Sequence, residues 1–363
     1  MTLDGGRLFA AASHRHSRVL PARQNVPVPH DFTWRDGERL IRFADGAARE
    51  AVELLEAQGF VGFALLTTLR GADSAPGIAG AAAALIEVPS GRVEEISASL
   101  LAEAGDRPLV ALGGGRVIDT AKAIAGARGG QPAAIPTTLS GAEMTPFHRR
   151  PVDVPGARLV RPGLVIADPA LMTSQSPPQL AASAMNALAH AMEALYTPLA
   201  NPVTELAALR AAELIAEALP REPPAHGDLA LGALLAGYAS GATGIAVHHA
   251  VCQTLVRVAG TPHAETNAVM LPHFARLMAG RAPATIGAFA AALGDPDGDP
   301  TAAGGRVAKL AARSGHTRLS TLGVEEEQLP EVVTVAEEHP LLANTPAPPD
   351  REELSRVLHE AFR

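Results

Sequence analysis

The sequence predicts an α/β domain built on a parallel sheet, followed by a domain made of helices alone. Between residues 31 and 168, short apolar runs of strand length alternate with segments that carry apolar residues at helical spacing. Strands that are apolar along their whole length and alternate with helices indicate a parallel sheet covered on both faces. After residue 168, long alanine- and leucine-rich segments with helical spacing dominate. We therefore expect a flexible extension (1–30), a Rossmann-like α/β domain (31–168) and a helical domain (169–363).

The elements of the α/β domain are expected in a regular order. Residues 1–30 contain three prolines and show no clean periodicity. A helix over 45–57 is predicted from its apolar spacing, and Gly59 ends it. The run 108–112 leads straight into three glycines, after which a helix begins. The predicted strands are 61–68, 83–88, 108–112, 132–135 and 164–167, and the predicted helices are 45–57, 93–104 and 117–127.

The second half contains apolar segments of helical spacing, which proline, glycine and asparagine separate. Alternation typical of strands is nearly absent there. The predicted helical segments are 179–196, 202–219, 228–255, 264–280, 284–293, 301–314 and 351–362.

Composition and charge exclude several classes of protein. The formal charge is −8, from 30 basic and 38 acidic residues, and no run is rich in basic residues, which argues against a nucleic-acid partner. No apolar stretch reaches the ~18 residues of a membrane helix, and the N-terminus shows no signal-peptide pattern. The single cysteine, Cys252, is expected to be a buried small residue and indicates the reducing cytoplasm.

A glycine-rich turn between a strand and a helix is the first candidate site, and it contains Gly113, Gly114 and Gly115. Backbone N–H groups on such a turn, with the positive end of the following helix, can hold a pyrophosphate. Asp119 and Lys122 lie three residues apart on one face of that helix. We expect the compact ammonium of Lys122 to reach a cofactor ribose or carboxamide. The alternative is a tight turn followed by a salt-bridged surface helix, because three glycines alone are a weak motif.

A second loop carries hydroxyl groups after the strand 132–135. Thr137, Thr138 and Ser140 follow the carboxyl end of a parallel strand, where open α/β sheets bind ligands. The alternative is a helix cap, with Glu143 completing a capping box. The two interpretations are compatible.

The end of the strand 61–68 bears on the choice of cofactor. Thr67 lies near the end of this strand and belongs to the expected cofactor site. No acidic residue follows the strand at the place where one is expected to bind the ribose 2′-OH of the cofactor. Arg70 could accept a 2′-phosphate instead. Both NADH and NADPH therefore stay open.

Histidines from three helical segments form the third candidate site. Asn186 and His190 lie four residues apart on one helix face. His249 follows in a later helix with His248 beside it, and His263 begins the next helix. Three imidazoles match the ligand set of a divalent metal, for which a carboxylate is the expected fourth ligand. Asn186 offers a neutral amide instead, which argues against a tightly held metal. The alternative for each histidine is a hydrogen-bonded packing residue.

Taken in order, these motifs resemble the iron-containing alcohol dehydrogenase superfamily. They are GGGxxxDxAK from Gly113, PTTxSGxE from Pro136, NAxAHAxE from Asn186, and HH followed by PHAETxA and LPH. SAMNALAHAMEALY, HHAVC and PHAETNAVMLPH further resemble the maleylacetate reductase branch. The resemblance runs from about residue 40 into the helical half, and its motifs end near His273.

The resemblance implies the dehydroquinate synthase-like fold of iron-type alcohol dehydrogenases and a homodimer. It implies that NADH or NADPH is bound by the glycine loop, Asp119, Thr137 and Thr138. Metal-dependent members are expected to hold an ion with an aspartate at the position of Asn186 and with histidines at those of His190, His249 and His263. The reductase branch lacks that carboxylate, as this chain does. Its members deliver a hydride to the unsaturated bond of a short oxo-dicarboxylate, giving 3-oxoadipate.

These observations predict an NAD(P)H-dependent reductase of a small unsaturated oxo acid that works without a metal. The expected catalytic group consists of Asn186, His190, His249 and His263, with the histidines as proton donors whose pKa is near neutrality. Candidate clamps for a substrate carboxylate are Arg149, Arg150 and Arg257.

Three departures from the family pattern keep other functions open. Arg116 stands where the loop usually has serine, and Gln253 replaces a usual histidine and cannot relay a proton. The segment between Glu143 and Asp168 is shorter and carries His148-Arg149-Arg150. One alternative is a metal-dependent (iron or zinc) alcohol dehydrogenase. The other is a biosynthetic enzyme on the same scaffold with no net redox chemistry.

Overall fold

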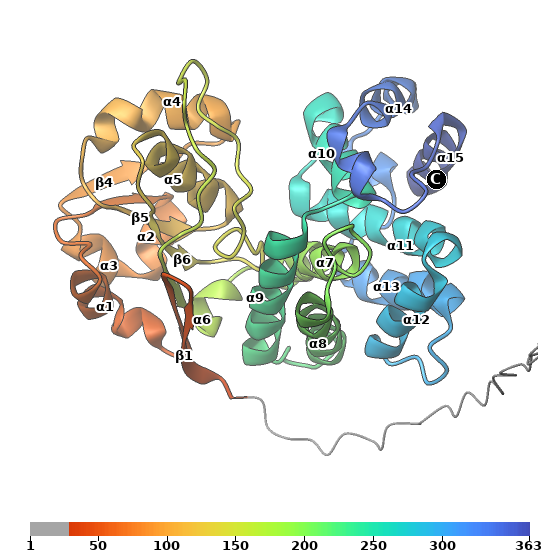
Figure 1. Ribbon diagram of the computed structural model, residues 1–363, viewed down its shortest axis with the longest axis horizontal. Helices are drawn as coiled ribbons and strands as arrows, with labels where there is room; N and C mark the ends of the chain where they lie inside the picture. Colours follow the sequence, from red (N-terminus) through yellow and green to blue (C-terminus); the bar gives the residue numbers. More distant parts are fainter. Residues whose placement is uncertain (1–28) are drawn as a thin grey trace, which may run out of the picture.

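The computed structural model describes residues 29–363, which form two parts that lie side by side. Figure 1 shows a sheet with its covering helices on one side and a group of helices on the other. The chain passes from the first part to the second after the last strand. The expected extension, 1–30, lies outside the described residues except for its last two.

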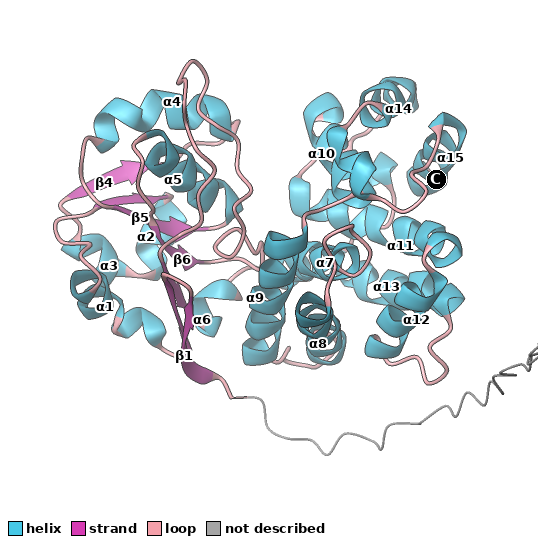
Figure 2. Cartoon of the chain, in the orientation of Figure 1, coloured by secondary structure: helices cyan, strands magenta, loops and turns pink. Residues whose placement is uncertain are grey.

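The described residues contain one seven-stranded sheet in the order β1-β2-β7-β6-β5-β3-β4. Figure 2 shows its strands in magenta. All neighbours from β2 to β4 pair in parallel, as predicted. The strands are β1 (Asp31–Asp36), β2 (Arg39–Ala44), β3 (Ala64–Thr67), β4 (Ala84–Glu87), β5 (Leu109–Gly113), β6 (Ala133–Pro136) and β7 (Leu164–Ala167).

A hairpin at one edge corrects the prediction of a sheet that is parallel throughout. β1 pairs antiparallel with β2, and Gly37 turns the chain between them with a φ of 60°. The side chains of β1 alternate between exposed and half-buried, which is typical of an edge strand. Sequence reasoning missed both strands because Arg35, Arg39 and Arg42 interrupt the apolar pattern.

Helices cover both faces of this sheet. They are η1 (Ala47–Arg49), α1 (Ala51–Ala57), α2 (Leu69–Ser74), α3 (Pro76–Ala81), α4 (Val93–Ala104) and α5 (Gly115–Ala127). Leu65 and Val110 belong to the core beneath α1 and α3, whereas Leu66 and Ala111 belong to the core beneath α4 and α5. Because β5 and β6 pair in parallel with Gly113 opposite Pro136, the loops that leave them meet at one edge of the sheet.

The second part consists of helices within the described residues. They are α6 (Pro169–Met172), α7 (Pro177–Ala194), α8 (Pro202–Ala218), α9 (His226–Thr243), α10 (Val247–Ala259), α11 (His263–Arg281), α12 (Pro283–Ala292), α13 (Ala303–Ala311), α14 (Leu329–Glu337) and α15 (Arg351–Phe362), with short 3₁₀ turns η2 (Pro300–Ala302), η3 (Ala312–Ser314), η4 (Leu319–Leu322), η5 (Glu326–Gln328) and η6 (Pro340–Asn344). α7 is buried along its whole length after Leu180 and contacts α8, α9, α11 and α13. It is the central helix of this part.

The segment 228–255, expected to be one apolar run, is two helices. α9 ends at Thr243, and the chain bends by 100° before α10 begins at Val247. Gly244 makes the bend with a φ of 88°, which a residue with a side chain rarely adopts. In the described part of the chain no single helix is long and apolar enough to cross a membrane, although α9 and α10 would pass that test taken together.

Candidate functional site

The loops after β5 and β6 lie against each other at the edge of the sheet. The N–H of Thr137 donates to the carbonyl oxygen of Gly113 at 3.0 Å. A Cβ atom on Gly114 would lie 2.9 Å from Cγ2 of Thr138, so glycine is needed for this approach. No side chain caps the N-terminus of α5, and Oγ1 of Thr138 is buried without a partner among the described residues. These open donors form a cradle that fits a pyrophosphate.

Lys122 lies inside the protein rather than beside the expected cofactor. Its side chain has no exposed surface, and Nζ donates to the carbonyl oxygens of Ala142 at 2.9 Å, Thr145 at 3.1 Å and Phe147 at 2.7 Å. Nζ also lies 2.7 Å from Oδ1 of Asp119. Because these oxygens occupy all donors of an ammonium group, the expected contact with a cofactor is corrected: Lys122 anchors the loop after β6.

Glu143 is a second buried charge in this loop. It has no exposed surface, and its carboxylate oxygens find no partner outside their own residue in the described structure. Arg39 binds the backbone oxygen of Glu143 at 3.0 Å, not its carboxylate. Burial raises the pKa of the Glu143 carboxyl to about 7, although Lys122 and Arg39 lower it.

Thr67 and Arg70 are also bound within the chain. Thr67 is fully buried, and its Oγ1 donates to the carbonyl oxygen of Leu112 at 2.7 Å. Its expected contact with a cofactor is therefore corrected to a role in joining the ends of β3 and β5. Arg70 is exposed, and Nη2 donates to the carbonyl oxygen of Ser174 at 2.8 Å.

α7 and α10 bring two of the predicted histidines face to face. The rings of His190 and His249 are stacked, with centroids 4.3 Å apart and planes inclined by 18°. The ring of His248 meets that of His249 edge-on at 5.2 Å. The residues are 7%, 2% and 0% exposed for His190, His249 and His248.

The expectation that these imidazoles have a pKa near neutrality was wrong. Burial lowers the pKa of His248 and of His249 to about 3, and it lowers that of His190 well below its usual value. Removing a side chain from water disfavours its charged form. All three rings are therefore neutral at pH 7.

Glu193 closes the motif NAxAHAxE, but sequence analysis assigned it no role in the site. It lies one turn after His190 on α7 and has no exposed surface. The backbone N–H groups of His248 and His249 donate to its Oε1 at 2.8 and 3.3 Å, and Nδ1 of His249 lies 2.5 Å from Oε2. Burial raises the pKa of Glu193 and lowers that of His249, so burial disfavours the charged form of each partner. The signal in the sequence was a lone acid in an apolar helix, three residues after a histidine.

Asn267, within the motif PHAETNAVMLPH, also received no role in the sequence analysis, and it joins His248 to His263. Its Oδ1 lies 2.8 Å from Nε2 of His248, and its Nδ2 lies 3.3 Å from Nε2 of His263. This pattern makes Nε2 of His248 a donor and Nε2 of His263 an acceptor. His263 begins α11 with an exposed side chain. Desolvation lowers the pKa of His263, and the negative charge of Asp119 on α5 raises it.

The histidine group adjoins the loop after β6. Nδ2 of Asn186 donates to the carbonyl oxygen of Ser140 at 3.3 Å, and Oγ of Ser183 accepts from the N–H of Leu139 at 2.9 Å. A Cβ atom on Gly237 of α9 would lie 3.0 Å from Cα of Gly141, so the backbones touch there. The loop is therefore bound to the helical part along its first residues.

Four buried polar atoms of this group have no hydrogen-bond partner among residues 29–363. They are Oδ1 of Asn186, Nδ1 of His190, Nδ1 of His248 and Nε2 of His249. Asn186 and His190 share one face of α7, and His249 stacks on His190. Buried polar atoms without partners mark a place that a polar ligand completes.

These donors do not match a tightly held metal ion. No three histidine, cysteine, aspartate or glutamate side chains in the described part are grouped so as to hold one. Lone pairs of an imidazole lie in the ring plane, so the stacked rings of His190 and His249 do not both point at one ion ~2 Å away. Asn186 adds an amide oxygen in place of a carboxylate. The residues present do not fit the iron or zinc site of metal-dependent relatives.

The remaining candidates are placed as follows. Cys252 is buried, and burial raises the pKa of its thiol, which agrees with the expected small packing residue. Arg116 and Arg257 are exposed. Nη2 of Arg149 donates to Oε1 of Gln253 across the two parts at 3.4 Å.

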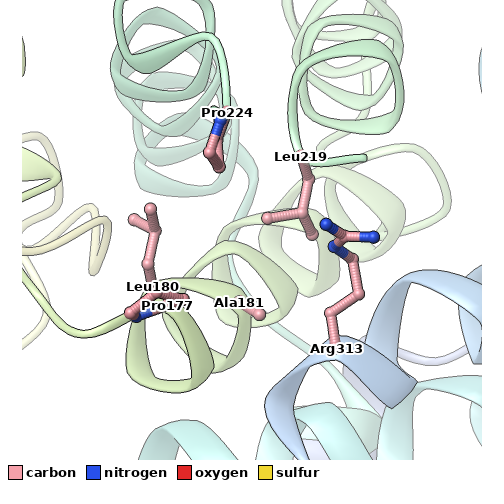
Figure 3. Close-up of a pocket in the computed structure, with 6 residues that line it drawn as sticks. All are labelled: Pro177, Leu180, Ala181, Leu219, Pro224 and Arg313. Atoms are coloured by element: carbon pink, nitrogen blue, oxygen red, sulfur yellow. The ribbon is translucent and has the colours of Figure 1, made fainter. Parts of the chain in front are cut away.

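An apolar pocket elsewhere in the helical part has no catalytic groups. Its volume is about 300 Å³, and Figure 3 shows it lined by Pro177, Leu180, Ala181, Leu219, Pro224 and Arg313. Pro177 begins α7, roughly 20 Å along the helix from His190. The pocket is therefore separate from the histidine group.

Comparison with known proteins agrees with this geometry. Residues 180–362 match the Fe-containing alcohol dehydrogenase family, C-terminal. Maleylacetate reductase 1 of Rhodococcus opacus is 36% identical over 244 residues, which cover 64% of this chain and 67% of that protein. The maleylacetate reductase of Burkholderia cepacia is 33% identical over 346 residues, which cover 89% of this chain and 95% of that protein.

Solved structures share the fold over nearly the whole chain. The crystal structure of maleylacetate reductase from Agrobacterium tumefaciens superposes with a TM-score of 0.78 and 30% identity, covering 92% of this chain and 99% of that chain. The structure of sulfoacetaldehyde reductase from Bifidobacterium kashiwanohense in complex with NAD+ superposes with a TM-score of 0.76 and 25% identity, covering 90% and 98%. The predicted fold class is confirmed.

Proposed function

Because the chain belongs to the Fe-containing alcohol dehydrogenase family and is an oxidoreductase, we propose that it reduces a small unsaturated oxo acid with NADH or NADPH, as a maleylacetate reductase-like enzyme. One observation carries the proposal. The neutral His249, backed by the buried Glu193, stacks on His190 one turn from Asn186, which offers an amide in place of a carboxylate next to a loop that fits a pyrophosphate. We expect a homodimer in the cytoplasm.

We assign the cofactor to the loops after β5 and β6. The glycine loop and the open N–H groups of α5 hold its pyrophosphate, and the hydroxyls of Thr137 and Thr138 lie beside them. Asp119 lies at the next turn of α5, and its negative charge raises the pKa of His263. When bound, the reduced nicotinamide supplies a hydride.

The reaction also consumes one proton. Hydride addition to a C=C bond conjugated with an oxo group leaves an enolate, which must be protonated on carbon to give the saturated oxo acid. We assign the donor to Nε2 of His249. As Nε2 gives up its proton, Glu193 passes its own proton to Nδ1, so the imidazole stays neutral and Glu193 becomes a carboxylate held by three hydrogen bonds. A proton from solvent then restores the pair.

The other polar residues position this pair and the substrate. His190 stacks on His249 and limits rotation of its ring. Asn186 presents an unpaired acceptor, Oδ1, to a ligand. His263, whose Nε2 accepts from Asn267, is left with Nδ1–H as a donor for a substrate oxygen.

Turnover with maleylacetate tests the proposal directly. We expect nicotinamide absorbance to fall when purified protein, NADH or NADPH and maleylacetate are mixed, and activity to persist after chelation. Near-stoichiometric iron or zinc that activity requires would instead indicate a metal-dependent alcohol dehydrogenase. Failure of both cofactors to bind in a fluorescence titration would favour a biosynthetic enzyme without redox chemistry.

A further inference from the structure

The loop between β6 and β7 carries a positive charge to the helix of His249. Arg149 lies on this loop with an exposed side chain, and Nη2 donates to Oε1 of Gln253 at 3.4 Å. Gln253 lies one turn after His249 on α10, so both project from one face of that helix. The contact joins the sheet part to the helix that holds the assigned proton donor.

Hydrogen bonds fix the backbone around Arg149. Nδ1 of His148 lies 3.0 Å from the carbonyl oxygen of Arg149, and Nε2 accepts from the N–H of Val160 at 3.1 Å. Nδ1 therefore donates and Nε2 accepts, which is the pattern of a neutral ring. Lys122 holds the preceding turn through the carbonyl oxygen of Phe147. Hydrogen bonds to Phe147 and His148, and to the carbonyl oxygen of Arg149 itself, therefore hold this residue in place.

The charge of Arg149 is not neutralised by the described residues. Its one hydrogen bond, to the neutral amide of Gln253, leaves the other N–H donors of the guanidinium open. Burial and then the charge of Arg149 lower the pKa of His339 in the helical part. In a chain of net charge −8, an unneutralised cation at this place favours an anionic ligand.

Distance along α10 separates Arg149 from the other candidate clamps. Gln253 is four residues from His249, or about 6 Å along the axis, whereas Arg257 is eight residues away, or about 12 Å. A carboxylate four to five bonds from the reacting carbon spans about 6 Å. Arg150 is exposed and makes no hydrogen bond or ion pair with any described residue.

We propose that Arg149, seated by Gln253, binds the substrate carboxylate that lies farther from the reduced bond. The guanidinium supplies two parallel N–H donors, and the free amide N–H of Gln253 supplies a third. This residue pair therefore selects oxo acids with a second carboxylate over simple aldehydes and alcohols. The inference rests on the proposed function for the identity of the reaction, but not for the presence of the carboxylate site.

Two neighbouring variants test the assignment by kinetics. We expect Arg149→Gln to raise KM for maleylacetate roughly 10- to 100-fold, with kcat changed less than about threefold and the Kd of NADH unchanged. Arg150→Gln removes the same charge one residue away and is expected to leave all three values within about twofold. Gln253→Glu places a carboxylate against Arg149 and is expected to raise KM as Arg149→Gln does.

A binding measurement separates this inference from the proposed function. Glutarate, a stable five-carbon dicarboxylate that cannot be reduced here, is titrated by calorimetry into the wild type and Arg149→Gln, each saturated with NAD+. Glutarate binding that is lost only in Arg149→Gln supports the site even where maleylacetate is not reduced. Maleylacetate turnover with an unchanged KM in Arg149→Gln overturns the site and leaves the proposed function standing. The absence of both glutarate binding and a KM change overturns it as well.

Discussion

Replacement of Glu193 by glutamine tests the proton path with almost no change of shape. The Oε1 atom of the amide can still accept from the backbone N–H groups of His248 and His249, which lie 2.8 and 3.3 Å from it in the wild type. What is lost is the acid proton opposite Nδ1 of His249. After Nε2 donates to substrate, the amide has no proton to pass on, and an imidazolate would have to form.

The size of the effect follows from this loss. Positioned general acids contribute about 10²- to 10⁴-fold, so we expect kcat of Glu193→Gln to fall at least ~100-fold, or about 2.7 kcal/mol. KM and NADH affinity change little, because Glu193 is fully buried behind His249. The hydrogen bond between two neutral groups, residue 193 and Nδ1 of His249, is weakened, which changes the free energy of unfolding by about 1 kcal/mol.

The pH dependence of kcat distinguishes a proton donor from a packing residue. Burial raises the pKa of Glu193, and the path requires its protonated form, so kcat of the wild type falls as pH rises through that pKa. In Glu193→Gln this limb disappears. The exposed Glu205→Gln on α8 is the matched control, with wild-type kinetics expected. A folded Glu193→Gln enzyme with kcat within threefold of wild type and the same pH limb would refute the reasoning.

Three further predictions concern stability and the cofactor loop. The folded-state pKa of Glu143, about 7, exceeds the ordinary 4.5, so its protonated form stabilises the native state below pH 4.5 and this stabilisation is lost as pH rises to 7. Denaturant unfolding should therefore show Glu143→Gln gaining about 3 kcal/mol relative to wild type between pH 4 and pH 8, and parallel curves would contradict this. In Gly114→Ala the new Cβ atom would lie 2.9 Å from Thr138 in the loop after β6, so the Kd of NADH should rise about tenfold in a fluorescence titration. Gly130→Ala is the control, because a Cβ atom there has nothing within 4 Å and should leave the Kd unchanged. Lys122→Met leaves three buried carbonyl oxygens without a donor and should lower the free energy of unfolding by about 3–5 kcal/mol, with Lys309→Met as the control; an equal loss in both would remove the anchoring role.

Local patterns predicted most elements of the fold. The helices 93–104 and 351–362 and the strand 164–167 have the bounds found in the structure, because apolar spacing and end signals coincide there, as in the capping box at Asp350. The bend between α9 and α10 was missed because the residues around Gly244 stay apolar on both sides, and only the φ of that glycine shows the break.

Sequence analysis predicted which residue types form the candidate site but not how deeply their side chains are buried. The structure brings His190, His249 and Asn186 together, as expected, but it buries Lys122 and Thr67 inside the protein. The burial was not predicted because helical or strand spacing indicates the direction of a side chain and not how far it is buried. The partner of His249 on another helix has no local signal, since the contact joins residues 56 apart in the chain. The low imidazole pKa values follow from this burial and were unpredictable for the same reason.

The two parts of the molecule are joined unequally. Along the loop after β6, backbone touches backbone at Gly141 and Gly237, and hydrogen bonds reach Ser183 and Asn186. At Arg149 a single bond of 3.4 Å spans the same junction. The guanidinium of Arg149 therefore lies where the two parts are joined weakly, whereas the histidines lie beside the loop where they are joined firmly. We expect an anionic substrate that reaches this guanidinium to compete with only this one weak hydrogen bond.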